Sequence, residues 1–282
     1  MKTISLRRMF PAVAAMLAAV SLASCNEYTA LLKSTDTEYK YEAAKQLYAE
    51  GQYNRATVIL GDLITAYKGT ERAEESLFLL GMSAFQSKNY ETAASVFRKY
   101  YQSYPKGIFA QEARYYCGCS LAANTPEPKL DQTDTYNAVT EFQNFLEAFP
   151  DSKYREPAQA AIFDLQDKLV EKEYLSAKLY YDLGTYFGNC TNGGSNYQAC
   201  VVTAENAIKD YPYTSRREDF AILILKAKFD LAASSVEEKK EERYHAAIDE
   251  YYGFTNEYPE SKFMPQANAL FRKAGKYIKT EE

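Results

Sequence analysis

The segment YETAASVFRKYYQSYP, residues 90–105, carries the pattern that decides the fold. Apolar residues stand at offsets 0, 3, 4, 7, 11 and 14 from Tyr90, a spacing that places them on one face of an α-helix. The segment closes with Tyr104 followed by Pro105. Proline disfavours helical backbone in the residue before it and has no N–H to continue the hydrogen-bond ladder, so this pair predicts a helix end.

The same pattern recurs in five segments, where a small residue is followed eleven positions later by a closing aromatic residue. The small residues are Ala56, Ala93, Ala138, Cys200 and Ala247, and the closing aromatics are Tyr67, Tyr104, Phe149, Tyr211 and Tyr258. Each copy predicts one helix that buries a single stripe. Short polar pairs such as Asp151-Ser152 then predict the start of the next helix, and Ser215 with Glu218 predicts a capping box.

A second small residue precedes the first in these copies. Gly81, Ala93 and Pro105 follow one another at intervals of twelve. This spacing resembles the tetratricopeptide repeat, in which small residues let helices A and B of a hairpin approach closely. The first copy has Ala44 twelve positions before its small residue but Lys68 in place of the proline.

Two copies depart from the interval of twelve. The segment NTPEPKLD, residues 124–131, lengthens the turn between helices A and B of the third copy, so that Gly118 precedes Ala138 by twenty. In the fourth copy Gly184 precedes Cys200 by sixteen, consistent with an insertion near the NGGS turn. We expect both insertions to lie outside the helices.

A longer gap separates the third and fourth copies. Pro150 and Gly184 are 34 positions apart, and the intervening residues keep a helical apolar spacing, which predicts one long helix or two abutting helices. We therefore expect an all-α tetratricopeptide-repeat superhelix of about five helical hairpins with a long linking helix. Residues 37–150 are predicted to hold repeats 1–3, and residues 151–282 the long helix and repeats 4–5.

The N-terminus has the features of an export signal. Lys2, Arg7 and Arg8 precede an apolar run over residues 9–23, which is shorter than the ~20 residues of a spanning helix. The sequence LASC at its end resembles the bacterial lipobox, whose cysteine is acylated and becomes the new N-terminus. Residues 1–24 are thus predicted to be a lipoprotein signal peptide, Cys25 a lipid anchor and residues 25–36 a linker. The alternative is an ordinary cleavage site that happens to precede a cysteine.

Charge and composition exclude several functions. The chain has a net charge of −5, and the mature chain has 30 basic against 38 acidic residues once the three in the signal are removed. Nucleic acid is therefore not an expected partner. The one histidine, His245, occupies a polar position of a helical pattern, so we expect a solvated surface residue rather than a catalytic base or a metal ligand. We expect no enzyme activity, no cofactor and no metal.

Four cysteines remain after the anchor. On a helix, Cys117 and Cys119 lie about 200° apart, so we expect both to pack in the core. Cys190 and Cys200 bracket a glycine-containing turn and would approach each other if that turn joins antiparallel helices. The sequence allows either a disulfide between Cys190 and Cys200 or two free thiols.

These features together resemble one family more closely than the repeat class. The lipobox, the five repeats and the stretch FDLQDKLVEKEYLSAKLYYDLGTYF, residues 163–187, are similar to the lipoprotein D component of the outer-membrane β-barrel assembly machinery. The resemblance implies a non-catalytic outer-membrane scaffold facing the periplasm. Its implied partners are the Omp85-type barrel subunit, other assembly lipoproteins, unfolded outer-membrane β-barrel proteins, and the membrane through the lipid anchor. The residues after Cys25 lack an aspartate and an acidic cluster, which favours this location.

Helix A positions line the concave surface of such arrays, and this surface suits extended peptides. The substrate groove candidates, counted in the frame of Gly81, are Tyr41, Tyr48, Phe78, Met82, Phe85 and Tyr115. The alternative for each is packing between helices. The family docks the barrel subunit through its C-terminal repeats, where an arginine of helix B is replaced here by Thr203, so that contact does not carry over. The docking candidates are Thr203, Arg216 and Arg217.

Two other functions stay open at this point. One is another tetratricopeptide lipoprotein adaptor, such as a Tol-Pal or cell-envelope coordinator, which tends to carry an N-terminal coiled coil that is not visible here. The other is a glycan-capturing outer-membrane lipoprotein. That class usually has a longer chain and tryptophan-rich sugar platforms, whereas this chain has no tryptophan.

The lipobox generates the first prediction. Cys25→Ser removes the thiol that accepts the lipid, so the protein is expected to stay uncleaved or to leave the outer membrane. Metabolic labelling with palmitate and membrane fractionation measure both effects. Outer-membrane attachment that persists in this variant without any lipid label contradicts the prediction.

Overall fold

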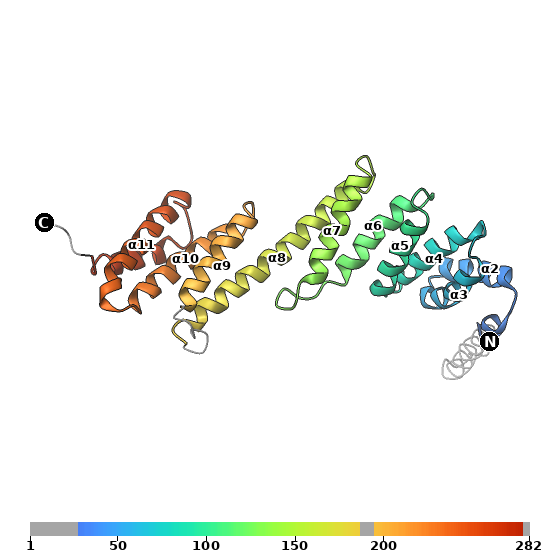
Figure 1. Cartoon of the computed structure of the whole chain (residues 1–282), viewed down its shortest axis with the longest axis horizontal. Helices are drawn as coiled ribbons and strands as arrows, with labels where there is room; N and C mark the ends of the chain where they lie inside the picture. Colours follow the sequence, from blue (N-terminus) through green and yellow to red (C-terminus); the bar gives the residue numbers. More distant parts are fainter. Residues whose placement is uncertain (1–27, 187–194, 279–282) are drawn as a thin grey trace, which may run out of the picture. The chain divides into compact units, whose positions relative to one another are not determined.

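A computed structural model describes residues 28–186 and 195–278 of the chain (Figure 1). Residues 28–33 are helical. The helices that follow are α2 (Thr37–Ala49), α3 (Tyr53–Ala66), α4 (Arg72–Gln86), α5 (Tyr90–Ser103), α6 (Ala110–Ala123), α7 (Thr133–Ala148), α8 (Arg155–Leu183), α9 (Asn196–Asp210), α10 (Arg217–Ala233), α11 (Glu237–Glu257) and α12 (Met264–Ala274). These ranges contain no strand, so the all-α prediction is confirmed. The signal peptide, Cys25 and Cys190 lie outside the described residues.

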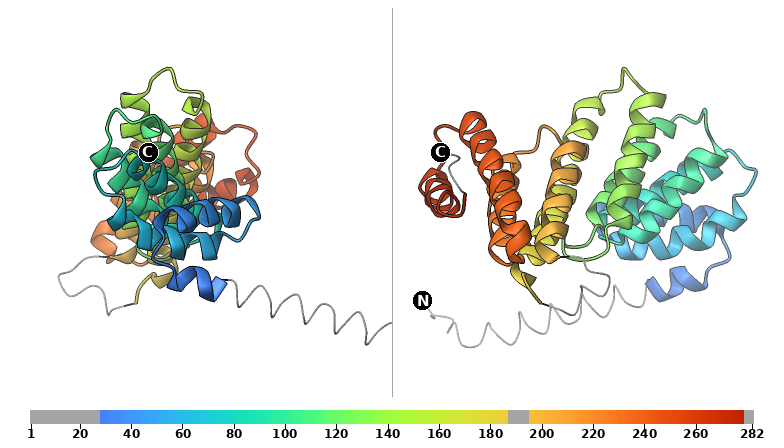
Figure 2. Two further views of the ribbon diagram at one scale, coloured as in Figure 1. Left: turned by 90° about the vertical axis from the view of Figure 1, so that its right-hand side faces the viewer. Right: turned by 60° about the vertical axis from the view of Figure 1, so that its left-hand side comes forward.

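The chain packs as two compact units. Among the described residues, unit 1 comprises 28–125 and 136–161, and unit 2 comprises 126–135, 162–186 and 195–278. In unit 1, α2 to α6 pack in chain order, and α7 from residue 136 onward packs against α6 through Phe142 (Figures 1 and 2). In unit 2, α9, α10 and α11 pack in succession, and α12 covers α10 and α11. The predicted long helix is α8, a single helix of 29 residues.

Two glycines, which have no side chain, allow the paired helices of unit 1 to approach closely. A Cβ added to Gly81 of α4 would stand 2.6 Å from Cε1 of Phe97, and one added to Gly118 of α6 would stand 2.7 Å from Cε1 of Phe142. Both rings are fully buried. The ring of helix B therefore rests directly on the backbone of helix A, as the repeat spacing predicts.

The closing aromatics end their helices where the sequence predicts. Before proline, Tyr104, Tyr211 and Tyr258 share one non-helical conformation, with φ of −128°, −126° and −129° and ψ of 65°, 67° and 61°. Tyr67, which Lys68 follows, keeps a helical φ of −89° and ψ of 0°. The clash between the proline ring and the preceding residue accounts for the difference.

The buried side chain of Tyr100 stabilises the turn after α5 through hydrogen bonds. Tyr100 is fully buried, whereas Tyr101, which the periodicity assigns to the buried stripe, is only half-buried. The hydroxyl of Tyr100 donates to the Glu74 carboxylate and accepts the N–H of Phe109 at 3.1 Å. The same carboxylate accepts the N–H of Ile108 at 2.7 Å. Because these polar groups satisfy one another, the tyrosine can be buried at little cost.

Two local predictions need correction. Gly184 does not lie inside a helix A but follows the end of α8, where its φ of +52° lets the chain leave the helix. The small residue of α8 that packs in the same buried cluster as Cys200 is Ala177 instead. Ser215 does not cap α10, because the N-cap is Arg216 and no side chain caps it.

The side chain that shapes this turn is that of Thr214, one residue before Ser215. Thr214 Oγ1 accepts the N–H of Arg216 at 3.2 Å, just as Ser152 accepts from Tyr154 and Ser261 from Phe263. Hydroxyl-bearing residues thus shape three equivalent turns by bonding the backbone two residues ahead.

The glycine packing generates the second prediction. Gly81→Ala forces its methyl group against the Phe97 ring, so the variant is expected to lose about 1–3 kcal/mol of unfolding free energy. Gly61→Ala is the matched control, because nothing lies within 4 Å of a Cβ built at this position of α3. The control is expected to gain up to about 1 kcal/mol from helix propensity. Urea unfolding followed by circular dichroism distinguishes the two signs, and equal effects would contradict the packing role.

Candidate functional site

Metal binding and nucleophilic chemistry in proteins use acidic, histidine or cysteine side chains, all of which occur in the described residues. No group of three or more His, Cys, Asp or Glu side chains within them is arranged to hold a metal ion. His245 is exposed on α11, as predicted. Burial raises the pKa of Cys117 to about 12 and that of Cys119 to about 11, so these thiols are protonated at neutral pH. Protonated thiols are poor nucleophiles and poor metal ligands.

Cys200 is buried in α9, and burial raises the pKa of its thiol to about 12. Its predicted partner, Cys190, is outside the described residues, so a disulfide between them stays a prediction.

None of the described helices is both long enough and apolar enough to cross a bilayer.

Tyr41, a predicted groove residue, differs from the expectation. It is fully buried in unit 1, with its ring edge-on to Tyr67 at a centroid distance of 5.7 Å. The cations of Lys45 and Arg72 lie 4.9 and 4.8 Å from the ring centroid. Burial raises the pKa of the Tyr41 hydroxyl. The ring is covered by its neighbours and offers no open surface to a peptide.

Phe78 also serves the packing of unit 1. Its ring stacks on Phe109 at 4.4 Å with 8° between the planes, and it meets Tyr100 edge-on at 5.8 Å. The stack joins α4 to the start of α6. Phe78 itself is half-buried, so its packing against these rings does not decide whether it also contacts a peptide.

The other four groove candidates are all half-buried. Tyr48 meets Tyr53 edge-on at 5.3 Å, and Phe85 meets Tyr116 edge-on at 5.4 Å. Tyr115 stacks on Tyr154 at 4.4 Å. We name the aromatic row of unit 1 as Tyr48, Phe85, Tyr115 and Tyr116, with Met82 beside it. Each ring is held by another ring but keeps accessible surface, which is the arrangement that apolar peptide side chains require.

The predicted docking arginines already have partners inside unit 2. Arg216 pairs with Glu171 of α8 and with Asp219 at 3.4 Å, and its guanidinium lies 4.5 Å from the centroid of Tyr174. These contacts tie the turn before α10 to α8. Arg216 therefore has a structural role, whatever else it contacts.

Arg217 makes a second tie in unit 2. Its Nε donates to Glu257 Oε1 of α11 at 2.7 Å, and this hydrogen bond lowers the pKa of the Glu257 carboxyl. Thr203 is half-buried on α9. The structure leaves the docking role of the three residues untested, and it stays a prediction.

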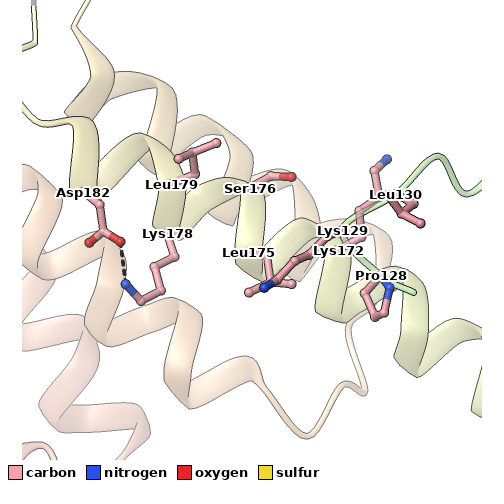
Figure 3. Close-up of a pocket in the computed structure, with 9 residues that line it drawn as sticks. All are labelled: Pro128, Lys129, Leu130, Lys172, Leu175, Ser176, Lys178, Leu179 and Asp182. Atoms are coloured by element: carbon pink, nitrogen blue, oxygen red, sulfur yellow. Dashed lines mark hydrogen bonds and ion pairs between the residues drawn. The ribbon is translucent and has the colours of Figure 1, made fainter. Parts of the chain in front are cut away.

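A pocket in unit 2 was missed by the sequence analysis. It has a volume of about 540 Å³ and lies between the segment 128–130 and α8 (Figure 3). Leu130 on one side and Leu175 and Leu179 on the other provide apolar walls, and Lys129 and Lys172 stand at its edge. The sequence feature that accompanies this pocket is the NTPEPKLD insertion, whose length predicts a longer turn but not a pocket.

The sequence of the chain is similar to a known protein family and to curated proteins of two bacteria. The sequence model of the YfiO family, described as an outer membrane lipoprotein, matches residues 33–193. A protein of Caulobacter vibrioides named outer membrane protein assembly factor BamD is 22% identical over 176 residues, which are 61% of this chain and 58% of that protein. A protein of Rickettsia prowazekii with the same name is 23% identical over 141 residues, 48% of this chain and 56% of that protein.

The chain thus spans less than three fifths of the length of these curated relatives. Among solved structures, the TPR2AB-domain:pHSP90-complex of yeast Sti1 aligns with a TM-score of 0.38 and 13% identity. That alignment covers 85% of this chain and 98% of the yeast chain.

The burial of Tyr41 generates the third prediction. Tyr41→Ala opens a cavity in the core of unit 1 and is expected to lower its unfolding free energy by about 3 kcal/mol. Tyr39→Ala, in the same helix but 55% exposed, is expected to change it by less than about 0.5 kcal/mol. Urea unfolding of both variants provides the measurement. The prediction is contradicted if both variants lose similar unfolding free energy, or if Tyr41→Ala loses none. Tyr41 would then be a surface residue.

Proposed function

Because the chain belongs to the YfiO family of outer membrane lipoproteins, we propose that it is a lipid-anchored, periplasm-facing scaffold of the β-barrel assembly machinery. In this role it binds unfolded outer-membrane β-barrel proteins and the Omp85-type barrel subunit, and it supports their folding and insertion without catalysing a reaction. The names of the Caulobacter and Rickettsia relatives, outer membrane protein assembly factor BamD, support this proposal.

The observation that carries the substrate-binding half of the proposal is the aromatic row of unit 1. Its rings come from successive hairpins and are half-exposed, while their partners within unit 1 hold them in fixed orientations. Strands of β-barrel proteins alternate apolar and polar side chains. An extended strand can place its apolar side chains against such a row while its polar side chains remain in water.

The docking half of the proposal rests on unit 2. Its helices α9, α10 and α11 pack in succession, and the turn before α10 is fixed by the ion pairs of Arg216 and Arg217. A rigid surface is suited to a permanent partner because little conformational entropy is lost on binding. We assign the Omp85-type subunit to this unit and the transient substrates to unit 1.

Replacement of two half-buried rings tests the substrate site. Tyr48→Ser with Phe85→Ser is expected to weaken capture of a urea-unfolded β-barrel protein by about fivefold or more, because each aromatic contact contributes about 0.5–1.5 kcal/mol. The full-length lipoprotein is used in a pull-down, with circular dichroism to verify helix content. The matched control is Tyr252→Ser, which removes a ring that is 52% exposed in unit 2.

The same variants report on docking. Co-purification with the barrel subunit is expected to be unchanged in the double variant, because unit 2 is intact.

Photo-crosslinking in intact cells tests both assignments. A photo-crosslinking residue placed at Thr203 should capture that subunit, and one placed at Phe85 should capture barrel precursors. Normal substrate capture by a folded double variant contradicts the groove assignment, and capture of a different envelope protein at both positions contradicts the proposed function.

A further inference from the structure

The chain between the predicted lipid anchor and unit 1 is very short. Residues 28–33 form a helix, and only Asn26 and Glu27 separate this helix from Cys25. Because an extended chain spans about 3.3–3.6 Å per residue, the Cα atoms of Cys25 and Tyr28 can be at most about 11 Å apart. The segment that the sequence predicts to be a linker therefore provides little free chain between the anchor and the first described helix.

This first helix is packed into the core of unit 1. Leu31 is 6% exposed and belongs to the buried cluster that also contains Tyr41 and Ile59. The ring of Tyr28 packs against the same cluster, and the Arg55 guanidinium of α3 lies 4.9 Å from its centroid. Burial of an apolar side chain at this position holds the helix on the unit. A group attached just before Tyr28 therefore stays close to the surface of unit 1.

Hydrogen bonds also fix the connection from this helix to α2. Ser34 donates its N–H to the carbonyl of Leu31 at 3.2 Å, and its Oγ accepts the N–H of Asp36 at 3.1 Å. Asp36 in turn caps α2 by accepting the N–H groups of Glu38 and Tyr39, both at 3.0 Å. A side chain that caps a helix in this way stabilises its first turn. The described segment before α2 is thus a folded extension of the first hairpin.

The side of unit 1 next to this helix exposes tyrosine and polar side chains. Tyr39 of α2 is 55% exposed, and Gln46 and Glu50 on the same face of α2 are also exposed. Together with Tyr28 and Arg55 they line a hollow of about 200 Å³. We name these five residues the cap surface. Tyrosine suits a membrane interface, because its ring is apolar while its hydroxyl can bond to headgroups and water.

We propose that the short tether holds the cap surface of unit 1 against the headgroup region of the membrane in which Cys25 is anchored. The acyl chains place Cys25 at the interface, so the surface around Tyr28 stays within reach of the headgroups. The start of α6 lies further along unit 1, because α2 packs on α4 and α4 on α6. At 8–10 Å per helix spacing, it is about 16–20 Å from α2. This inference rests on the proposed function, which includes the lipid anchor.

Fluorescence quenching by lipid-borne nitroxides tests the membrane contact. The acylated lipoprotein carries a fluorescent amino acid in place of Tyr39 and is placed in phosphatidylcholine nanodiscs with a nitroxide on the lipid headgroup. The matched control carries the fluorescent amino acid in place of Ile108, which is 79% exposed and lies two residues before α6. Quenching at the Tyr39 position is expected to be about twofold or more stronger than at the Ile108 position, because the cap surface is close to the headgroups.

A spacer tests the role of the tether. A flexible Gly-Ser segment of about 20 residues, inserted after Asn26, has a root-mean-square length of about 22–27 Å. Quenching at the Tyr39 position is then expected to fall towards the value at the Ile108 position. The same segment added after Glu282 is the matched control and should leave quenching unchanged. The insertion site precedes the first described helix, so the fold should be preserved, and circular dichroism verifies this.

Mass spectrometry of Cys25 separates this inference from the proposed function. If Cys25 is acylated and the Tyr39 position is quenched no more than the Ile108 position, the inference is wrong while the anchor stands. If Cys25 carries no lipid, the anchor and the inference are both wrong. Quenching that the spacer does not change contradicts the role of the tether. Emission typical of apolar surroundings without quenching would assign the cap surface to a second copy of the chain instead.

Discussion

The contact between a glycine backbone and a phenylalanine ring underlies the packing of unit 1. At Gly81 and Gly118 the absence of a Cβ lets a buried ring approach the backbone of the facing helix directly. Any side chain there would push the two helices apart and, with them, the neighbouring hairpins, because each hairpin packs on the next. The positions of the turns and of the exposed rings depend on where this contact places the helices.

Local rules explain how much of the fold could be predicted from the sequence. Tyr104, Tyr211 and Tyr258 marked helix ends because the effect of the following proline acts on the adjacent residue and needs no tertiary information. The predictions for Gly184 and Ser215 failed for the opposite reason. Whether a glycine lies inside or after a helix, and whether a hydroxyl caps that helix or the turn before it, depends on neighbours that the pattern does not reveal.

The candidate site was less predictable than the fold. Tyr41 and Tyr48 occupy helix A of the same hairpin and look alike in sequence, but only Tyr41 is enclosed, because Tyr67, Lys45 and Arg72 gather around it. The pocket was hidden for a related reason. Leu130 and Leu179 are 49 positions apart, and only the packing of the insertion in unit 2 brings them to one surface. Burial at such positions is decided by residues distant in sequence.

Burial of the cysteines has a consequence for the redox chemistry of the chain. Thiol–disulfide exchange proceeds through the thiolate, and burial, which raises the pKa of the Cys117 thiol to about 12, keeps this thiol protonated at pH 7. Oxidants and disulfide isomerases would therefore find almost no nucleophile at this residue while unit 1 stays folded. In an oxidising compartment, the packing of the repeat itself would keep this cysteine reduced without a dedicated reductase.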